Sequence, residues 1–310
     1  MNNAIKGYAL GAIAAATYGM NPAFTLPLYA IGIDSESVLL FRYLFAILIL
    51  GIMLKARGHS FGLSPRHILP LVALGLVFAF SSEGLFLSYN YMDAGIASTL
   101  LFVYPIMVAL IMAVFFHERF TSHTAVCLIM ATIGIALLYR ASDGSTLSLT
   151  GTLFVMSSSL SYAIYIVAVN RSIFTDIPTI KITFYALLFG SLLFAVILAF
   201  RGHVCIPDSQ HWYLWTNLAA LGLLPTAVSL ICTTAAIQYI GSTPTAILGA
   251  IEPVTAVILG IIFFNESLTM REFSGLVLII FAVSLVVAGG NINKYVNRLR
   301  KMFPRIIKVR

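Results

Sequence analysis

Two glutamates lie inside stretches of sequence that are otherwise apolar. Glu83 follows "LVFAFSS", and Glu252 lies within "TAILGAIEPVTAVILGIIFF". A carboxylate inside a lipid bilayer costs several kcal/mol unless it is protonated, paired or hydrated. Each glutamate is therefore a candidate for proton coupling or for binding the amine of a substrate. The alternative for Glu83 is an ion pair with Arg42, and the alternative for Glu252 is a permanently protonated structural carboxyl.

Other polar and aromatic residues recur at helical spacing in neighbouring segments. Thr17, Asn21 and Thr25, for example, follow one another at intervals of four residues. A single serine or threonine more often lets membrane helices pack closely, but stripes on several segments predict a mildly polar, aromatic-lined central cavity. The candidate substrate-binding residues are Thr17, Tyr18, Asn21, Glu83, Asn90, Tyr104, Ser161, Tyr162, Tyr165 and Glu252.

Two prolines occupy the middle of long apolar segments. Pro105 and Pro253 each remove a backbone donor and kink the helix. In lipid the freed carbonyl needs a partner, so such breaks occur beside other helices or a wet cavity. We predict that both prolines shape gates, and a kink that serves packing alone is the alternative.

The sequence contains no pattern typical of an enzyme. "FFHERFT" holds the one His-Glu pair, and it lacks the second histidine of the zinc-protease motif. Cys127, Cys205 and Cys232 lie far apart, without the spacing of a zinc site or a disulfide framework. We predict no catalytic residue, no metal and no cofactor, so the chain is not expected to be an enzyme.

Composition defines the elements that must position these residues. Of the 310 residues, 60% are hydrophobic and 9% charged, against roughly 25% charged in soluble domains. With a mean hydropathy of +0.99, the chain is predicted to be an all-α integral membrane protein. Spans of about 20 apolar residues are expected near 7–29, 38–55, 67–89, 96–116, 122–139, 150–170, 180–200, 213–238, 244–264 and 271–289.

The positions of lysine and arginine predict how these ten spans are oriented. With a cytoplasmic N-terminus, 14 basic residues fall on the cytoplasmic side and 3 on the other, or 7 against 3 without the tail. Both termini are expected in the cytoplasm. Much of the net charge of +7 lies in the tail at 291–310, so it does not indicate nucleic-acid binding. This tail is expected to be either an interfacial basic helix or a disordered segment.

The chain carries an internal repeat. A shift of 148 residues places Pro105 on Pro253 and "FFHERFT" on "FFNESLT", and a weaker match places the surroundings of Tyr18 on those of Tyr162. The repeating unit is five helices, and consecutive copies of an odd unit insert upside down. We therefore predict ten transmembrane helices as two inverted five-helix repeats, at 1–140 and 141–290, followed by the basic tail at 291–310.

These features resemble the EamA family of the drug/metabolite transporter superfamily. The resemblance rests on "YGMNPAF", on "AGIASTLLFVYPIMVALIMAVFFHERFT" and on its second copy, "GSTPTAILGAIEPVTAVILGIIFFNESLT", and covers the chain to about Asn291. It implies a ten-helix carrier of small metabolites, commonly an exporter of amino acids or related compounds. Two positions depart from the family pattern. Many members carry tryptophan at the position of Tyr18, and the pattern does not require the carboxyl of Glu252.

The sequence thus predicts a multi-pass secondary transporter of the bacterial inner membrane, a monomer or homodimer, with export as the direction that the resemblance implies. The substrate is expected to be an amino acid, amine or drug-like compound, moved by alternating access with proton coupling through Glu252 and Glu83. A nucleotide-sugar or sugar-phosphate antiporter is the alternative, although spans 1, 3, 4, 6, 8 and 9 have no interior Lys or Arg for phosphate. A channel or a membrane-embedded enzyme is a weaker alternative.

Overall fold

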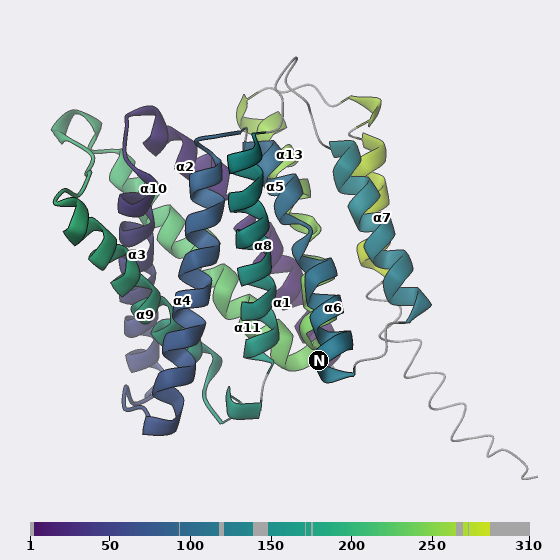
Figure 1. Cartoon of the computed structure of the whole chain (residues 1–310), viewed down its shortest axis with the longest axis horizontal. Helices are drawn as coiled ribbons and strands as arrows, with labels where there is room; N and C mark the ends of the chain where they lie inside the picture. Colours follow the sequence, from purple (N-terminus) through teal and green to yellow (C-terminus); the bar gives the residue numbers. More distant parts are fainter. Residues whose placement is uncertain are drawn as a thin grey trace, which may run out of the picture.

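The computed structural model describes residues 3–92, 94–117, 121–138, 148–170, 172–174, 176–264, 269–271 and 273–285. Within this part of the chain all regular structure is helical (Figure 1). The elements are α1 (Asn3–Tyr18), α2 (Asn21–Ala30), α3 (Ser35–Ala56), α4 (Pro65–Ser88), α5 (Ala94–Leu101), α6 (Tyr104–Phe116), α7 (Ser122–Leu138), α8 (Leu149–Val169), η1 (Ser172–Phe174), α9 (Thr179–Arg201), η2 (Ser209–His211), α10 (Leu214–Leu221), η3 (Gly222–Val228), α11 (Ser229–Ile240), α12 (Ser242–Leu248), α13 (Ile251–Phe264) and a last apolar helix, Phe273–Leu285.

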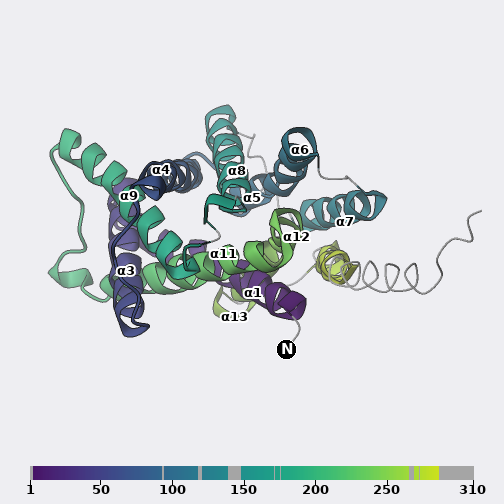
Figure 2. The same cartoon turned by 90° about the horizontal axis from the view of Figure 1, so that it is seen from below.

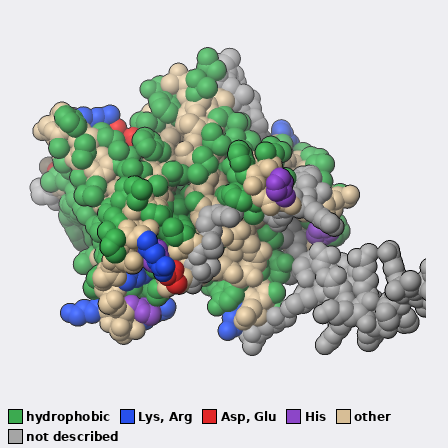
Figure 3. Space-filling model, turned by 60° about the horizontal axis from the view of Figure 1, so that its bottom comes forward, with side chains coloured by type: hydrophobic (Ala, Val, Ile, Leu, Met, Phe, Trp, Pro, Cys, Tyr) green, Lys and Arg blue, Asp and Glu red, His purple; other side chains and the backbone are tan. Residues whose placement is uncertain are grey.

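Five of these helical stretches are long and apolar enough to cross a bilayer. They are α3, α4, α8, α9 and the continuous stretch Leu214–Ile240. Large apolar side chains on them face outward, among them Ile52 at 62% and Phe200 at 90% exposure. Hydrophobic side chains cover most of the visible face (Figure 3). Soluble proteins do not expose apolar surface on this scale, so the outer surface of the described chain is suited to lipid.

Two helices far apart in the sequence pack against each other. In Figure 2, α11 runs through the middle of the molecule and α1 lies along its lower side. On one side, α4 packs against both α8 and α9, and α3 packs against α9. The half-helices α12 and α13 contact α1, so the residues of the second half surround the first helix. The centre of the bundle is therefore built from residues of both halves of the sequence.

Helices occupy each of the ten predicted segments, but three segments contain two shorter helices instead of one. The first segment breaks at 19–20 between α1 and α2, the fourth at 102–103 between α5 and α6, and the ninth at 249–250 between α12 and α13. Adding 148 to the bounds of α5 and α6 gives 242–249 and 252–264, which match α12 and α13 to within one residue.

The prolines explain where these breaks fall, and they correct the prediction of a kink within one helix. Pro22 and Pro105 lie in the first turn of α2 and α6, and Pro253 lies in the first turn of α13. A first-turn residue has no carbonyl to donate to, so proline fits there without losing a hydrogen bond. Proline also disfavours helical geometry at the residue before it. Each break therefore comes shortly before the proline.

A different proline distorts the eighth segment without breaking it. Pro225 has no N–H to donate to the Leu221 carbonyl, and the chain widens into the π-helix η3. The Thr226 hydroxyl donates to that carbonyl instead, at 2.7 Å. The same hydroxyl accepts a hydrogen bond from Arg42 Nε at 2.5 Å, and Arg42 Nη2 donates to the Pro225 carbonyl at 3.4 Å. Arg42 of α3 thus holds the widened turn in place.

We predict that Thr226→Val destabilises the protein by about 1–3 kcal/mol, because it removes a buried hydrogen bond to the Leu221 carbonyl and leaves the Arg42 Nε–H without an acceptor. The measurement is the thermal unfolding of detergent-purified protein. Thr226→Ser is the matched control, since it keeps the hydroxyl, and its melting temperature should stay near that of the wild type. Equal melting temperatures for all three proteins would refute the role given to the hydroxyl.

Candidate substrate site

The three helix breaks meet near the centre of the bundle. At the first break, a Cβ added to Gly19 would lie 2.3 Å from the carbonyl oxygen of Glu252. At the third break, a Cβ added to Gly249 would lie 1.6 Å from the hydroxyl of Tyr104, the first residue of α6. Glycine at position 19 thus lets two backbones approach, and glycine at position 249 leaves room for the Tyr104 hydroxyl, so three interrupted helices converge at one level.

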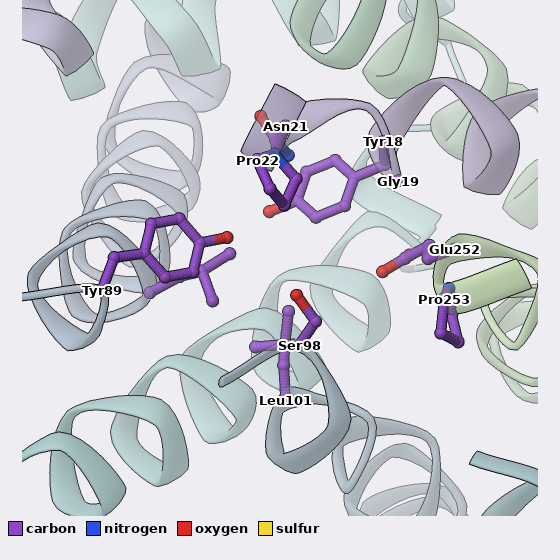
Figure 4. Close-up of a pocket in the computed structure, with 10 residues that line it drawn as sticks. Tyr18, Gly19, Asn21, Pro22, Tyr89, Ser98, Leu101, Glu252 and Pro253 are labelled. Carbon is purple, nitrogen blue, oxygen red and sulfur yellow. The ribbon is translucent and has the colours of Figure 1, made fainter. Parts of the chain in front are cut away.

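A first cavity opens on one side of this level, toward α2 (Figure 4). It is narrow in this conformation, with room for about one water molecule. The Tyr89 hydroxyl, the Ser98 hydroxyl and the Glu252 carboxyl point into a shared space, and Asn21 lies beside it. The lining residues are Tyr18, Gly19, Asn21, Pro22, Leu85, Tyr89, Ser98, Leu101, Glu252 and Pro253.

A second cavity lies on the other side of the same level, toward the beginning of α1. It is narrower still, with room for at most about one water molecule. Its α1 residues lie one to two turns before Tyr18. The others come from α6, α8, α11, α12 and α13, and from the break between α12 and α13, where Gly249 lies. The lining residues are Gly11, Ala14, Ala15, Tyr104, Tyr162, Ile166, Thr233, Thr245, Gly249 and Glu252. Glu252 is the residue that the two linings share.

Glu252 is held at this junction by two features. Its carboxylate accepts a hydrogen bond from the Tyr104 hydroxyl at 3.3 Å. It also lies in the first turn of α13, where the dipole of a helix stabilises negative charge. Tyr18, Tyr89 and Tyr162 lie within electrostatic range of it as well. The carboxyl therefore faces tyrosines from several helices, and among the described residues no cation lies within ion-pair distance.

An aromatic cluster surrounds the junction. The Tyr162 ring stacks on Tyr18, with centroids 5.9 Å apart and planes 8° apart, and meets the Tyr104 ring edge-on at 4.8 Å. Tyr18 and Tyr162 are the positions that the weaker sequence match places on each other, and Tyr104 and Glu252 are separated by the 148-residue shift. Predicted counterpart residues of the two halves thus touch at the centre of the molecule.

The comparison with protein families decides what kind of protein this is. The model of the EamA-like transporter family matches residues 5–140 and again residues 149–288. The chain belongs to the EamA-like transporter family. It is a multi-pass membrane transporter, as its exposed apolar helices also indicate.

Relatives of this EamA transporter also carry transporter names. An uncharacterized transporter of Archaeoglobus fulgidus is 30% identical over 62% of this chain and 66% of the relative. The uncharacterized transporter YdfC of Bacillus subtilis is 25% identical over 88% and 86%. The threonine/homoserine exporter RhtA of Salmonella typhimurium is 29% identical over 69% of each chain. A solved crystal structure shares the fold, with a TM-score of 0.77 and 16% identity, over 90% of this chain and 95% of the other.

The structure brings half of the ten predicted substrate-binding residues to the two cavities. Tyr18, Asn21, Tyr104, Tyr162 and Glu252 line them, and of the two predicted gating prolines Pro253 lines the first cavity while Pro105 is buried in α6. The other five, Thr17, Glu83, Asn90, Ser161 and Tyr165, are not among the lining residues.

The break at 19–20 explains why Thr17 does not join Asn21. An interval of four residues would place Thr17 and Asn21 on one face of a continuous helix. However, α1 ends at Tyr18 and α2 starts at Asn21. The Thr17 hydroxyl donates instead to the carbonyls of Ile13 and Ala14 in its own helix. Asn90 follows the end of α4 and is exposed, and Tyr165 is buried against Thr234.

Glu83 neither lines the cavities nor pairs with Arg42. It lies near the end of α4 beside Glu36, in the first turn of α3. Glu36 is well satisfied, since Arg201 contacts one carboxylate oxygen at 2.6 Å and Ser35 donates to the other at 3.0 Å. One oxygen of Glu83 is buried and has no partner among the residues that the structure describes. Two carboxyls therefore share one arginine at this end of the bundle.

We predict that Arg201→Gln lowers stability by about 1–2 kcal/mol, because two neighbouring carboxyls lose their cation, an effect reduced by the partial exposure of Arg201. Adding Glu83→Gln should restore part of the loss by removing one of the like charges. The measurement is the melting temperature of the two single variants and the double variant. If the double variant melts below Arg201→Gln, the charge arrangement proposed for this end is wrong.

Several lining residues were missed by the sequence analysis. Gly19, Tyr89 and Ser98 were not selected, although Gly19 stands in the quoted "YGMNPAF" and Ser98 in "AGIASTLL". A glycine followed shortly by proline inside an apolar segment is a signal for a break. Among the described residues, no group of three or more His, Cys, Asp or Glu side chains is placed to hold a metal ion.

Proposed function

We infer that the protein is a secondary carrier that exports a small zwitterionic or neutral metabolite, with an amino acid as the favoured class. The observation that carries this proposal is the position of Glu252. One carboxyl lies at the junction of two cavities that extend toward opposite ends of the bundle. A group that both cavities share is what alternating access needs, because the same site must serve each side in turn.

Inverted repeats supply a physical reason for two such cavities. The matching bounds of α5–α6 and α12–α13, the Tyr104–Glu252 hydrogen bond and the Tyr18–Tyr162 stack support two related five-helix halves around a central pseudo-two-fold axis. Residues related by such an axis touch only beside it. In known secondary transporters with this architecture, substrate sites lie at the repeat interface, beside interrupted helices. The repeat bounds and the ten-span topology are part of this proposal.

The direction and the substrate class are supported by similarity. RhtA of Salmonella typhimurium, a threonine/homoserine exporter by name, aligns over 69% of this chain. The excess of Lys and Arg on one side of the predicted topology supports cytoplasmic termini in a bacterial inner membrane. The basic tail at 291–310 falls outside the described residues.

Proton coupling through Glu252 completes the proposal. The carboxyl faces Tyr18 of α1, Tyr104 of α6, Tyr162 of α8 and Tyr89 at the end of α4. A proton and a substrate ammonium both neutralise a carboxylate, so each excludes the other. Inward movement of a proton would then exchange for outward movement of substrate. Glu83 is not among the residues that line either cavity, so Glu252 is the carboxyl that the coupling proposal keeps.

The test is counterflow in proteoliposomes loaded with unlabelled L-threonine and supplied with labelled L-threonine or L-homoserine outside. A carrier gives transient, saturable accumulation that depends on the internal substrate. Ion conductance without counterflow would instead favour a channel. Counterflow by other amino acids but not by these two would keep the mechanism and change the substrate.

A further inference from the structure

The break between α1 and α2 leaves several hydrogen-bonding groups buried without partners. Both amide atoms of Asn21, which is 2% exposed and lines the first cavity, lack a partner within the described structure. Asn21 is also the first residue of α2, a helix whose N-terminus has no side-chain cap among the described residues. The N–H groups of a first helical turn have no partner within the helix, and they favour negative charge.

A buried cation lies against the same break. Arg42 is 0% exposed, and its guanidinium carbon lies 6.0 Å from the centre of the Tyr18 ring and 5.2 Å from that of Phe86. Nε and Nη2 bind the widened turn of η3, while Nη1 is buried and has no partner within the described part of the chain. Among the described residues no carboxylate lies within ion-pair distance of Arg42. Arginine stays charged in proteins, so this charge lacks a counter-ion.

Arg42 and the carboxyl of Glu252 act electrostatically on the same two tyrosines. Tyr18 and Tyr89, which both line the first cavity, are each within electrostatic range of Arg42 and of Glu252. Figure 4 shows Asn21 and Tyr18 on one wall of this cavity and Glu252 on another. The cavity is therefore polarised, with donors and positive charge at the α2 end and a carboxyl at the α13 end.

We propose that the N-terminus of α2, the Asn21 amide and Arg42 form an anion subsite that holds the carboxylate of the substrate, while Glu252 receives its ammonium group. This assignment rests on the proposed transport function and adds the orientation of the bound molecule. One fixed cation opposite one carboxyl matches a molecule with one group of each sign. A phosphate dianion would gain one cation and meet the repulsion of Glu252, so the subsite favours a carboxylate.

In the conformation described, Tyr18 and Phe86 cover the guanidinium. The Asn21 amide is the direct donor to the carboxylate, and Arg42 stabilises it from behind Tyr18. Nη1 is the donor left over for direct contact when the Tyr18 ring turns. Arg42 therefore has two roles. Its Nε and Nη2 hold η3, while its positive charge and its Nη1 donor stabilise the substrate carboxylate. Thr226→Val disturbs the first role without removing the charge.

The experiment compares three probes in proteoliposomes as competitors of labelled L-threonine counterflow. The probes are L-threonine, L-threoninamide, which lacks the carboxylate, and 3-hydroxybutyrate, which lacks the ammonium. For the wild type we expect each altered probe to compete at least about tenfold more weakly than L-threonine, as the loss of one charged hydrogen bond implies. In Arg42→Gln, competition by L-threonine should weaken about tenfold while that by L-threoninamide changes less than threefold.

In Asn21→Ala, as in Arg42→Gln, L-threonine should lose part of its advantage over L-threoninamide as a competitor. The Asn21→Ala variant therefore tests the subsite if Arg42→Gln does not fold. Arg42→Lys should keep part of the discrimination between L-threonine and L-threoninamide. The matched control is Arg66→Gln, at an exposed arginine paired with Asp176.

Three outcomes would contradict the proposal. Folded Asn21→Ala and Arg42→Lys proteins that discriminate between the two probes like the wild type would overturn the subsite. Equal competition by L-threonine and L-threoninamide in the wild type would overturn it while transport stands. Absence of any counterflow would overturn the proposed function itself, and the subsite with it.

Discussion

Replacing Glu252 by glutamine is expected to reduce L-threonine counterflow by about 10- to 100-fold at neutral pH. Glutamine keeps the size of the side chain and can still accept the Tyr104 hydrogen bond, but it offers no charge to an ammonium group. A hydrogen bond to a charged group contributes about 1.5–3 kcal/mol, which corresponds to that range of affinity. The measurement is the initial rate of counterflow against substrate concentration, with protein content and orientation matched between liposome samples.

The same variant separates substrate binding from proton coupling. In the wild type we expect exchange to weaken as pH falls, because protons compete with the ammonium group for Glu252. In Glu252→Gln the residual exchange should be independent of pH over the same range. The matched control is Glu83→Gln, which removes a carboxyl that lines neither cavity. This variant should exchange substrate within about threefold of the wild-type rate, since no contact with substrate is lost. A large loss in Glu83→Gln, with Glu252→Gln active, would reverse the two assignments.

The membrane character and the helical segments were predictable from sequence because they depend on local composition. Long apolar runs between charges and loops locate α3, α4, α8 and α9 to within a few residues. The helix breaks were only partly predictable. Proline marks the second half-helix of each broken segment, but the break itself depends on a neighbouring backbone, such as that of Glu252 against Gly19, which comes from the other half of the chain.

The sequence alone indicates those residues of the candidate site that are unusual by themselves, and it misses those whose role depends on partners from other segments. Glu252 stands out as a carboxyl in an apolar helix, and the structure places it at the junction of the cavities. Glu83 looks the same in sequence, but Glu36 and Arg201 surround it in the fold. Arg42 was considered solely as a partner for Glu83. Its contacts with Thr226 and Pro225 span more than 180 residues, and no periodicity within one helix carries that information.

A methyl group at Gly19 is expected to abolish transport, because it would enter the junction from the backbone side. The added Cβ of Gly19→Ala would lie 2.3 Å from the Glu252 carbonyl oxygen and 3.1 Å from its Cα. Backbone atoms cannot move away by rotation of a side chain, so α1 and α13 must separate and shift the carboxyl. Overpacking of this kind costs about 1–3 kcal/mol, and we expect both a lower melting temperature and a loss of counterflow beyond tenfold.

The matched control for Gly19→Ala is Gly62→Ala, since a Cβ added there meets no atom within 4 Å. That variant should melt and transport like the wild type. Gly249→Ala should be milder than Gly19→Ala in stability, because the atom it meets is the hydroxyl of Tyr104, at 1.6 Å, which a side-chain movement can withdraw. Such a movement breaks the Tyr104–Glu252 hydrogen bond, so counterflow should still fall. Wild-type stability and counterflow in Gly19→Ala would contradict this prediction. The junction would then have room for a methyl group, and the close contact between the first and third helix breaks would not be part of the functional structure.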